Sequence, residues 1–336
     1  MRVVIAPDKF KGTATATELV EAIAAVVAEA GHEPVLVPMA DGGDGTLEAL
    51  GGANRTSTVT GPLGDQVDAE WRLAKGVAVI EMARASGLVL AGGAEGNEPL
   101  EATTRGTGEL IATAVARGAK RIIVGLGGSA TTDGGLGAVE AIGTPARLAG
   151  VQVEVATDVT TKFVDAARVF GPQKGATPAQ VAFLEARLRG VATRYRDAFG
   201  VDVESAEGAG AAGGLGGGLL ALGAEIISGF ELIAEELGLA EAIADADLVI
   251  TGEGELDRES FAGKVVGGVA DLCDEGDTPM LIVAGAVGPD HGGLPDGATA
   301  ISLSERYGLD QAIADPCGLA AQAVADWFAA NEASSA

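Results

Sequence analysis

The chain contains 336 residues, 47% hydrophobic and only 4% aromatic, so it is long enough for two domains with cores of Val, Ile, Leu and Ala. A formal net charge of −26 at pH 7 argues against nucleic acid or an anionic membrane as a partner, because both are bound through basic patches. Two cysteines and the lack of any apolar run of about 18 residues favour a cytoplasmic protein without a disulfide framework or a membrane span.

The N-terminal region has the pattern of a βαβ unit. Residues 3–6 and 34–39 are short apolar runs typical of strands, and residues 15–30 carry apolar side chains at helical spacing. The charged segments PDKFKGT and DGGDGT follow the two strands. Because ligands of open α/β sheets gather at the carboxyl ends of strands, we expect both segments to lie near a ligand.

The middle of the chain is expected to form a separate domain of mixed character. Residues 56–83 alternate in short runs, which predicts antiparallel hairpins with turns at Pro62, Gly64 and Gly76. The later elements of this domain are expected to be helices at 106–117, after Gly135 and at 178–195, and strands around Ile122 and at 151–156.

The last third returns to alternating strands and helices. Strands are expected at 248–251, 280–284 and 300–303, and helices near 265–272 and 319–330. Together with the first two strands they give an α/β fold with a flavodoxin-like sheet of five parallel strands. The predicted domains are therefore residues 1–56 with 240–336, and an inserted mixed α/β domain at 57–239. Such an insertion sets two groups of loops face to face, and we expect a cleft between the domains.

The segment RIIVGLGGSATTDGG, residues 121–135, has the composition of a phosphate-binding loop. Its apolar start predicts a buried parallel strand, and Gly127 and Gly128 would let backbone N–H groups approach an anion that a Cβ would block. The hydroxyl groups of Ser129 and Thr131 could donate hydrogen bonds to phosphate oxygens. We therefore interpret this segment as a nucleotide site.

Asp133, in the same segment, could hold a magnesium ion that bridges the phosphates. Two other interpretations remain open. GLGGSA at residues 125–130 also fits a dinucleotide fingerprint, although residues 144–147 lack the acidic residue expected about 20 positions later. Alternatively, the glycines serve only a tight turn between strand and helix.

The loop DGGDGT places Asp41 and Asp44 three residues apart on glycine-rich backbone. This spacing could bring both carboxylates to one cation or one hydroxyl group. The alternative is a structural role, in which an aspartate caps the helix expected at Leu47. The position of the loop at the end of a strand favours the functional interpretation.

The loop after the first strand carries Asp8, Lys9 and Lys11. Lysine is a point-charge partner for phosphate or carboxylate, and two lysines in one loop are notable in so acidic a chain. Ordinary surface lysines are the alternative, since most exposed ion pairs contribute little.

Lys174, in the loop FGPQKGAT, could reach a carboxylate or a phosphate. This loop is expected to lead into a helix capped by Thr177, with Pro178 in its first turn.

Two further glycine-rich segments have less specific patterns. GAGAAGGLGG, from Gly208, predicts either close backbone packing or a second anion loop. TGEGELD, residues 251–257, is expected to end a strand, and its acids and glycines suit metal or ribose contacts or, alternatively, a capped turn.

Taken in order, these motifs resemble the bacterial type I glycerate kinase family almost end to end. The resemblance rests on APDKFKG (6–12), DGGDGT (41–46), GLGGSATTDGG (125–135), VFGPQKGAT (169–177), GAGAAGGLG (208–216) and VITGEGELD (249–257). It implies transfer of the γ-phosphoryl group of ATP to D-glycerate, usually at the 2-hydroxyl, with Mg²⁺. It also implies a flavodoxin-like domain with an inserted α/β domain.

Positioning and charge neutralisation dominate phosphoryl transfer, and with the resemblance they give each residue an expected role. We expect Asp158 or Asp41 to accept the hydroxyl proton and Lys11 to stabilise the transferred group. The residues expected to bind substrate are Asp8, Asp44, Lys174 and Arg105. The residues expected to contact the nucleotide are Gly127, Gly128, Ser129, Ala130, Thr131, Gly252 and Gly254. The expected magnesium ligands are Asp133 and Glu253.

The chain departs from the family pattern at several places. Lys9 stands where the family usually has serine, residues 160–163 replace an Asn-Pro pair after Asp158, and Glu255 stands where arginine is common. The region between residues 141 and 151 is also shorter than usual. These departures leave substrate choice more open than reaction class.

The alternatives are a kinase of a related small hydroxy acid, a nicotinamide-dependent hydroxy-acid dehydrogenase, and an inactive glycerate-binding sensor. The expected partner is a small molecule, and the expected state is a cytoplasmic monomer or homodimer.

Overall fold

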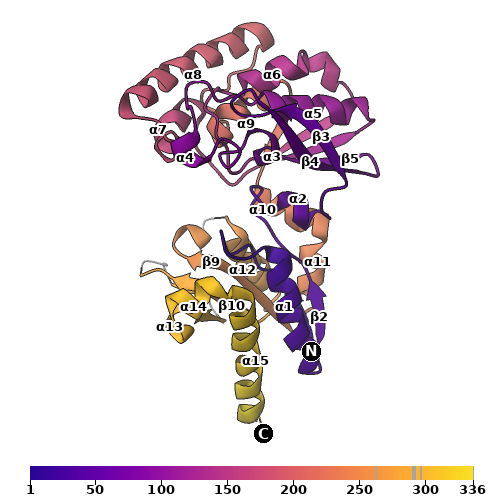
Figure 1. The fold of residues 1–336 in the computed structure, drawn as a ribbon. Coiled ribbons are helices and arrows are strands. Elements are labelled where there is room, and N and C mark those ends of the chain that lie inside the picture. Colours follow the sequence, from indigo (N-terminus) through magenta and orange to yellow (C-terminus); the bar gives the residue numbers. More distant parts are fainter. Residues whose placement is uncertain (262, 290–292, 296, 336) are drawn as a thin grey trace. The chain divides into compact units, whose positions relative to one another are not determined.

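The computed structural model describes residues 1–261, 263–289, 293–295 and 297–335. The chain divides into two compact units, one formed by Met1–Asp41 with Phe230–Ala336 and the other by Gly42–Gly229 (Figure 1). The borders therefore fall at 41/42 and 229/230, whereas the sequence suggested 56/57 and 239/240. The shift has a packing cause, because the segment after Gly42 is hydrogen-bonded to the second sheet and the Phe230 ring covers Gly268 in the first unit.

The first unit contains a five-stranded, all-parallel sheet. Its strands are β1 (Arg2–Ile5), β2 (Glu33–Leu36), β9 (Leu248–Leu256), β10 (Met280–Val287) and β11 (Ala298–Ser302). Their order in the sheet is β11-β10-β9-β1-β2. Numbered along the chain, this is the 2-1-3-4-5 order of a flavodoxin-like sheet, which confirms the predicted fold class.

Helices of the first unit bury the sheet through apolar faces. They are α1 (Ala16–Glu29), α10 (Gly229–Leu237), α11 (Leu239–Ala244), α12 (Val265–Glu275), α13 (Leu303–Tyr307), α14 (Leu309–Ala314) and α15 (Pro316–Ser335), with the 3₁₀ turn η4 (Glu259–Phe261). Thr15 and Glu18 form a capping box at the start of α1. α1 and α15 share one hydrophobic core with β1, β9 and β10 (Figure 1). No helix in the described part of the chain is both long and apolar enough to span a membrane.

The second unit contains a six-stranded mixed sheet. Its strands follow one another in the order β3 (Arg55–Thr60), β4 (Gln66–Ala74), β5 (Val77–Glu81), β6 (Arg121–Gly125), β7 (Gln152–Ala156) and β8 (Glu225–Ile227). The pairs β3/β4 and β4/β5 are antiparallel, as the hairpin pattern predicts, and the pairs from β5 to β8 are parallel. The carboxyl ends of β5, β6, β7 and β8 therefore lie along one edge of this sheet, called the carboxyl edge below.

The second unit holds eight further α-helices among the described residues, from four to 22 residues long. They are α2 (Thr46–Ala49), α3 (Ala83–Ser86), α4 (Gly93–Gly96), α5 (Arg105–Ala116), α6 (Leu136–Ile142), α7 (Ala166–Phe170), α8 (Pro178–Phe199) and α9 (Ala211–Ala221), with the 3₁₀ turns η1 (Pro145–Leu148), η2 (Phe163–Asp165) and η3 (Pro172–Lys174). Thr177 and Gln180 form a capping box on α8 with Pro178 at its first turn, so the expected cap is confirmed. In the shortened region, only η1 separates α6 from β7.

Candidate functional site

The loop after β6 turns its hydroxyl groups into the second unit. Ser129 is 9% exposed and Thr131 is fully buried. Gly128, at φ +60°, is exposed, and Gly127 is half-buried. The part of this loop that faces solvent is therefore the backbone of the two glycines, not the hydroxyl groups that were expected to donate to phosphate.

Lys174 binds this loop from the inside. Its side chain is buried, and its Nζ donates to Ser129 Oγ and to the carbonyl of Thr131, both at 2.7 Å. The Nδ2 of Asn97 donates to the carbonyls of Ala130 (3.0 Å) and Lys174 (2.9 Å). Burial lowers the pKa of Lys174 to about 7. Lys174 therefore contacts the protein interior, whereas the sequence suggested a substrate contact.

Asp133 is a structural link between two helix starts. Its Oδ2 accepts hydrogen bonds from Thr104 N (2.9 Å), Thr104 Oγ1 (2.8 Å) and Gly137 N (3.1 Å), and its Oδ1 accepts one from Gly135 N (3.0 Å). Thr104 precedes α5, and the two glycines flank the start of α6. With both oxygens occupied by protein donors, this carboxylate is poorly suited to the magnesium role expected from the sequence.

The glycine-rich segment from residue 208 forms close backbone packing. α9 has a kink in which Gly213 and Gly214 take positive φ values. A Cβ on Gly213 would collide with the carbonyl of Thr131, and one on Gly214 would stand 2.7 Å from the Cα of Gly134. Both glycines thus let the start of α9 lie directly against the loop after β6.

The DGGDGT loop packs on the solvent-facing turn of the loop after β6. A Cβ on Gly127 would stand 2.7 Å from Gly43 Cα and 2.8 Å from Asp44 N, and one on Gly128 would stand 2.9 Å from Asp44 Oδ1. Two motifs far apart in the sequence therefore touch through their glycines within the second unit. Gly125 and Gly127 are the glycines that also fit a dinucleotide fingerprint. The contact at Gly127 and the 2.9 Å distance from a Cβ on Gly125 to the carbonyl oxygen of Gly42 account for both.

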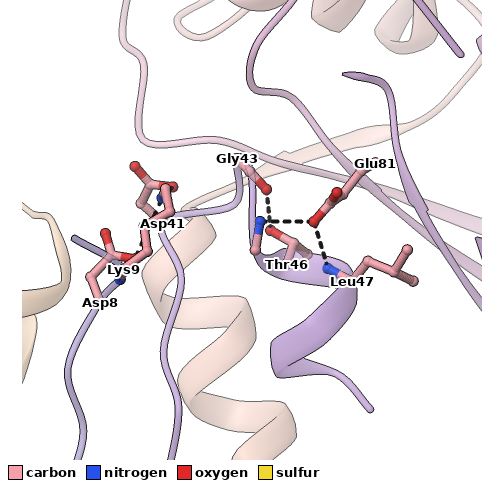
Figure 2. Close-up of polar contacts among 8 residues, drawn as sticks. Asp8, Lys9, Asp41, Gly43, Thr46, Leu47 and Glu81 are labelled. Atoms are coloured by element: carbon pink, nitrogen blue, oxygen red, sulfur yellow. Dashed lines mark hydrogen bonds and ion pairs between the residues drawn. The ribbon is translucent and has the colours of Figure 1, made fainter. Parts of the chain in front are cut away.

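A buried carboxylate at the end of β5 caps the start of α2, as Figure 2 shows. Oε1 of Glu81 accepts hydrogen bonds from Gly45 N (2.8 Å) and Leu47 N (2.9 Å). Thr46 Oγ1 donates to the carbonyl of Gly43 (2.7 Å) and closes the turn. The cap therefore comes from a neighbouring strand, rather than from an aspartate of the motif as the structural interpretation supposed.

Asp158 lies at the same carboxyl edge, directly after β7. It is half-buried, and its Oδ1 accepts hydrogen bonds from Ser228 Oγ (2.9 Å) and Gly229 N (2.8 Å), which follow β8. The DGGDGT loop passes nearby, since a Cβ on Gly42 would stand 2.7 Å from the carbonyl carbon of Ala156. The second unit thus brings Asp158 and the DGGDGT loop to one edge of its sheet.

The first unit has its own charged group after β1 and β2. Nζ of Lys9 lies 3.4 Å from Asp8 Oδ1 and 3.4 Å from Asp41 Oδ1 (Figure 2). A hydrogen bond from Met39 N to the carbonyl of Pro7 (3.0 Å) joins the two loops. Burial raises the pKa of Asp8 to about 6, with Lys9 opposing the rise and Asp41 adding to it.

Glu253 lies inside β9, because the strand continues to Leu256 and does not end at Thr251 as expected. Gly252 permits the continuation, since a Cβ there would collide with the carbonyl of Val283 in β10. Oε1 of Glu253 is buried and has no hydrogen-bond partner among the described residues. Burial raises the pKa of this side chain to about 7.

The remaining predicted residues are more exposed. A Cβ on Gly254 would stand 3.2 Å from Lys11 N, so the strand approaches the loop after β1, where the Lys11 side chain is exposed. Arg105 is exposed and pairs with Glu109 on its own helix (3.1 Å). In the described ranges, no three or more His, Cys, Asp or Glu side chains are grouped to hold a metal ion.

Sequence reasoning overlooked three residues of this arrangement, namely Glu81, Asn97 and Ser228. Glu81 had a detectable signal, because it is the one charged residue of the otherwise apolar run VAVIE. Asn97 and Ser228 lie in loops of ordinary polar composition and carry no comparable signal.

Known proteins match this arrangement over nearly the whole chain. The model of the glycerate kinase family matches residues 3–146 and 143–329. A glycerate 2-kinase from Escherichia coli (strain K12) is 43% identical over 332 residues, covering 87% of each chain. A glycerate kinase from Halalkalibacterium halodurans is 39% identical over 96% of each chain.

A solved structure agrees with these relatives. The crystal structure of a protein named as a glycerate kinase 2 from Salmonella typhimurium LT2 superposes with a TM-score of 0.81 and 35% identity, covering 99% of each chain. It shares the two-sheet α/β architecture described above. The chain belongs to the glycerate kinase family.

Proposed function

We propose that this protein transfers the γ-phosphoryl group of ATP to the 2-hydroxyl group of D-glycerate in the presence of Mg²⁺. Family membership supports the reaction class. The observation that carries the assignment of the site is the packing of Asp44 beside Gly127 and Gly128 at the carboxyl edge. It joins solvent-facing backbone and a carboxylate where parallel α/β sheets bind ligands.

The proposed phosphate contact involves fewer residues than the sequence suggested. Backbone N–H groups of Gly127 and Gly128 are assigned to it, because the side chains of Ser129 and Thr131 are buried. The polar contacts of Ser129 and Thr131 then stabilise the loop from within. Lys174 is likewise assigned to loop stability and not to a substrate carboxylate.

The chemistry of Glu253 fits a role in holding Mg²⁺. Its Oε1 is buried without a hydrogen-bond partner among the described residues, and a cation would satisfy it. Mg²⁺ is commonly held by one or two carboxylates together with substrate phosphates, so a complete protein cage is not required. Bound there, Mg²⁺ would neutralise charge on the phosphates. Asp133 is not retained as a ligand, because four protein donors already occupy its oxygens.

The proton of the attacking hydroxyl group requires an acceptor. In the proposed step, the glycerate oxygen forms a bond to the γ-phosphorus, the bond from that phosphorus to the β-phosphate oxygen breaks, and ADP leaves. Asp158 is the favoured proton acceptor, because two donors orient its Oδ1. Asp41 is the alternative, and Lys9 holds it in place.

The proposed source of positive charge is the loop after β1 in the first unit. Lys11 is exposed and is assigned to the transferred group, as the sequence suggested. Lys9 already binds Asp8 and Asp41, so its proposed role is to hold the two carboxylates together. Asp8 and Gly254 remain proposed ligand contacts, and Arg105 remains a proposed clamp for the substrate carboxylate. Gly252 is buried against β10 and is assigned to strand packing, not to the nucleotide.

The test is a turnover assay with purified protein, ATP, Mg²⁺ and D-glycerate, in which the product is identified by ³¹P and ¹³C NMR. Formation of 2-phosphoglycerate and ADP is expected, and L-glycerate and glycolate should react at least about 10-fold more slowly. Formation of 3-phosphoglycerate would overturn the assigned position. Failure to consume ATP with D-glycerate would overturn the proposal, and reaction with another hydroxy acid would then identify the substrate.

A further inference from the structure

Glu81 is a buried acid with no role in the proposed chemistry. It ends β5, is 3% exposed, and its carboxylate receives hydrogen bonds from two sides. On one side, Gly45 N and Leu47 N donate to Oε1. On the other, Arg84 Nε donates to Oε2 at 3.1 Å.

This set of partners requires a carboxylate. All three partners are N–H donors, and among side chains of this length only an ionised glutamate offers two oxygens that accept without donating. Glutamine would have to turn its NH₂ group toward either the two backbone N–H groups or Arg84. In either orientation the NH₂ group would face another N–H donor. The fold would then be destabilised, because a buried polar group would have lost its water without gaining a hydrogen bond.

The loop that Glu81 binds is otherwise held by the hydrogen bond from Thr46 Oγ1 to the Gly43 carbonyl and by its packing on Gly127. Gly42 and Gly45 both take positive φ values, +80° and +98°, and glycine at such positions leaves many backbone conformations accessible before folding. α2 has only four residues, and its N-cap residue makes no side-chain cap. The two hydrogen bonds to Oε1 therefore add to these contacts and fix the conformation of the turn that carries Asp44.

The selected conformation places Asp44 against the glycine turn. The backbone of Gly43 and Asp44 lies so close to Gly127 that a side chain on Gly127 would not fit. The Asp44 carboxylate lies beside Gly128. A small rotation of the turn would therefore move both the carboxylate and the backbone that it touches. Displacements of about 1 Å in positioning groups can cost roughly 100-fold in rate.

We propose that Glu81 is a positioning residue for phosphoryl transfer, acting through the Gly45 and Leu47 N–H groups to hold Asp44 against the glycine turn. It touches neither substrate nor nucleotide in this role. The inference rests on the proposed function, because the consequence of positioning is measured as turnover. The hydrogen bonds themselves can be tested without any activity.

The test compares four variants with the wild type. Glu81→Gln should lower kcat/KM for ATP by about 10- to 100-fold, whereas Arg84→Met should lower it by no more than about threefold, because water can solvate the freed oxygen. The double variant should regain most of the loss of Glu81→Gln, since the amide NH₂ no longer faces Arg84. Glu70→Gln is the matched control, because Glu70 also pairs with Arg84 (3.5 Å) but is exposed and does not touch the loop.

Two readouts separate positioning from a loss of folding or a wrong assignment of function. Turnover is compared at a temperature well below the melting temperature of every variant, so that a loss of turnover in Glu81→Gln that persists there reflects positioning and not unfolding. Amide hydrogen exchange at Gly45 and Leu47 should be faster in Glu81→Gln whether or not glycerate is the substrate. Unchanged exchange and turnover in Glu81→Gln, or no recovery in the double variant, would overturn the inference.

Discussion

The carboxylate of Asp44 lies so close to Gly128 that a Cβ on this glycine would stand 2.9 Å from Asp44 Oδ1. Because Gly128 also has φ +60°, Gly128→Ala combines strain with displacement of the carboxylate, and we expect a stability loss of about 1 kcal/mol. Turnover should fall by at least about 10-fold, as measured by ATP consumption with D-glycerate.

Gly64→Ala supplies the control for that change. Gly64 has φ +92° but nothing within 4 Å of its added Cβ, so the variant carries strain without displacement. A similar loss of stability with normal turnover is expected. Equal loss of turnover in the two variants would show that the contact with Asp44 is not what matters.

Asp158→Asn tests the proton acceptor. An asparagine oxygen can keep the hydrogen bonds from Ser228 and Gly229, so the loop should keep its shape while the side chain loses its basicity. We expect kcat to fall by at least about 100-fold with little change in glycerate KM, measured by steady-state kinetics.

The companion variant is Asp41→Asn. If Asp158 is the acceptor, Asp41→Asn should retain more activity than Asp158→Asn. Normal turnover in Asp158→Asn together with inactive Asp41→Asn would transfer the role to Asp41.

Lys9→Ser, which introduces the residue expected from the family resemblance, should raise the pKa of Asp8 further above about 6, because Lys9 opposes the rise caused by burial. A folded-state pKa above the ordinary value of 3.8 means that the folded protein binds more protons between the two values. The contribution of Asp8 to stability is therefore present below about pH 4 and is lost as pH rises through about 6. In Lys9→Ser this loss should extend to higher pH, as followed by urea unfolding and ¹³C NMR of the Asp8 carboxyl group.

Lys9→Arg retains the positive charge and serves as the comparison. Its Asp8 titration should stay close to that of the wild type. An Asp8 titration in Lys9→Ser that matches the wild type would contradict the electrostatic role of Lys9.

The arrangement of strands could be predicted because apolar runs and motif positions are local signals. The five parallel strands follow from short apolar runs alternating with helices. DGGDGT was expected after a strand, and the structure places it between β2 and the start of α2. The end of β9 was misjudged, because the acids and glycines of TGEGELD resemble a loop. In the structure, Gly252 instead admits the neighbouring backbone and lets the strand continue.

The directions of the polar side chains could not be predicted from local pattern. Ser129 and Thr131 have the composition of a phosphate loop, yet both side chains point inward. Lys174, 45 residues beyond Ser129, donates to Ser129 Oγ, and the carbonyl of Ala212 accepts from Thr131 Oγ1. Asp133 is occupied by donors from the starts of two helices. Such partners become visible only when the fold brings distant segments together.

Lys174→Met should change how stability depends on pH. The folded-state pKa of Lys174, about 7, lies below its ordinary value of 10.5, so between these values the unfolded chain binds more protons than the folded protein. The stability of the wild type should therefore rise as pH increases from about 7 to about 10, because burial of the charged amine is no longer required. A neutral amine still has two N–H donors, which is enough for both Ser129 Oγ and the Thr131 carbonyl.

The measurement is urea unfolding of the wild type and Lys174→Met at intervals from pH 6.5 to 10, with the exposed Lys120→Met as the matched control. Methionine cannot titrate, so the difference in unfolding free energy between wild type and Lys174→Met should grow with pH, while Lys120→Met should follow the wild type. A constant difference across the range would show that the ammonium is not penalised by burial. Lys174 would then have to be reconsidered as a charged group that can reach an anionic ligand.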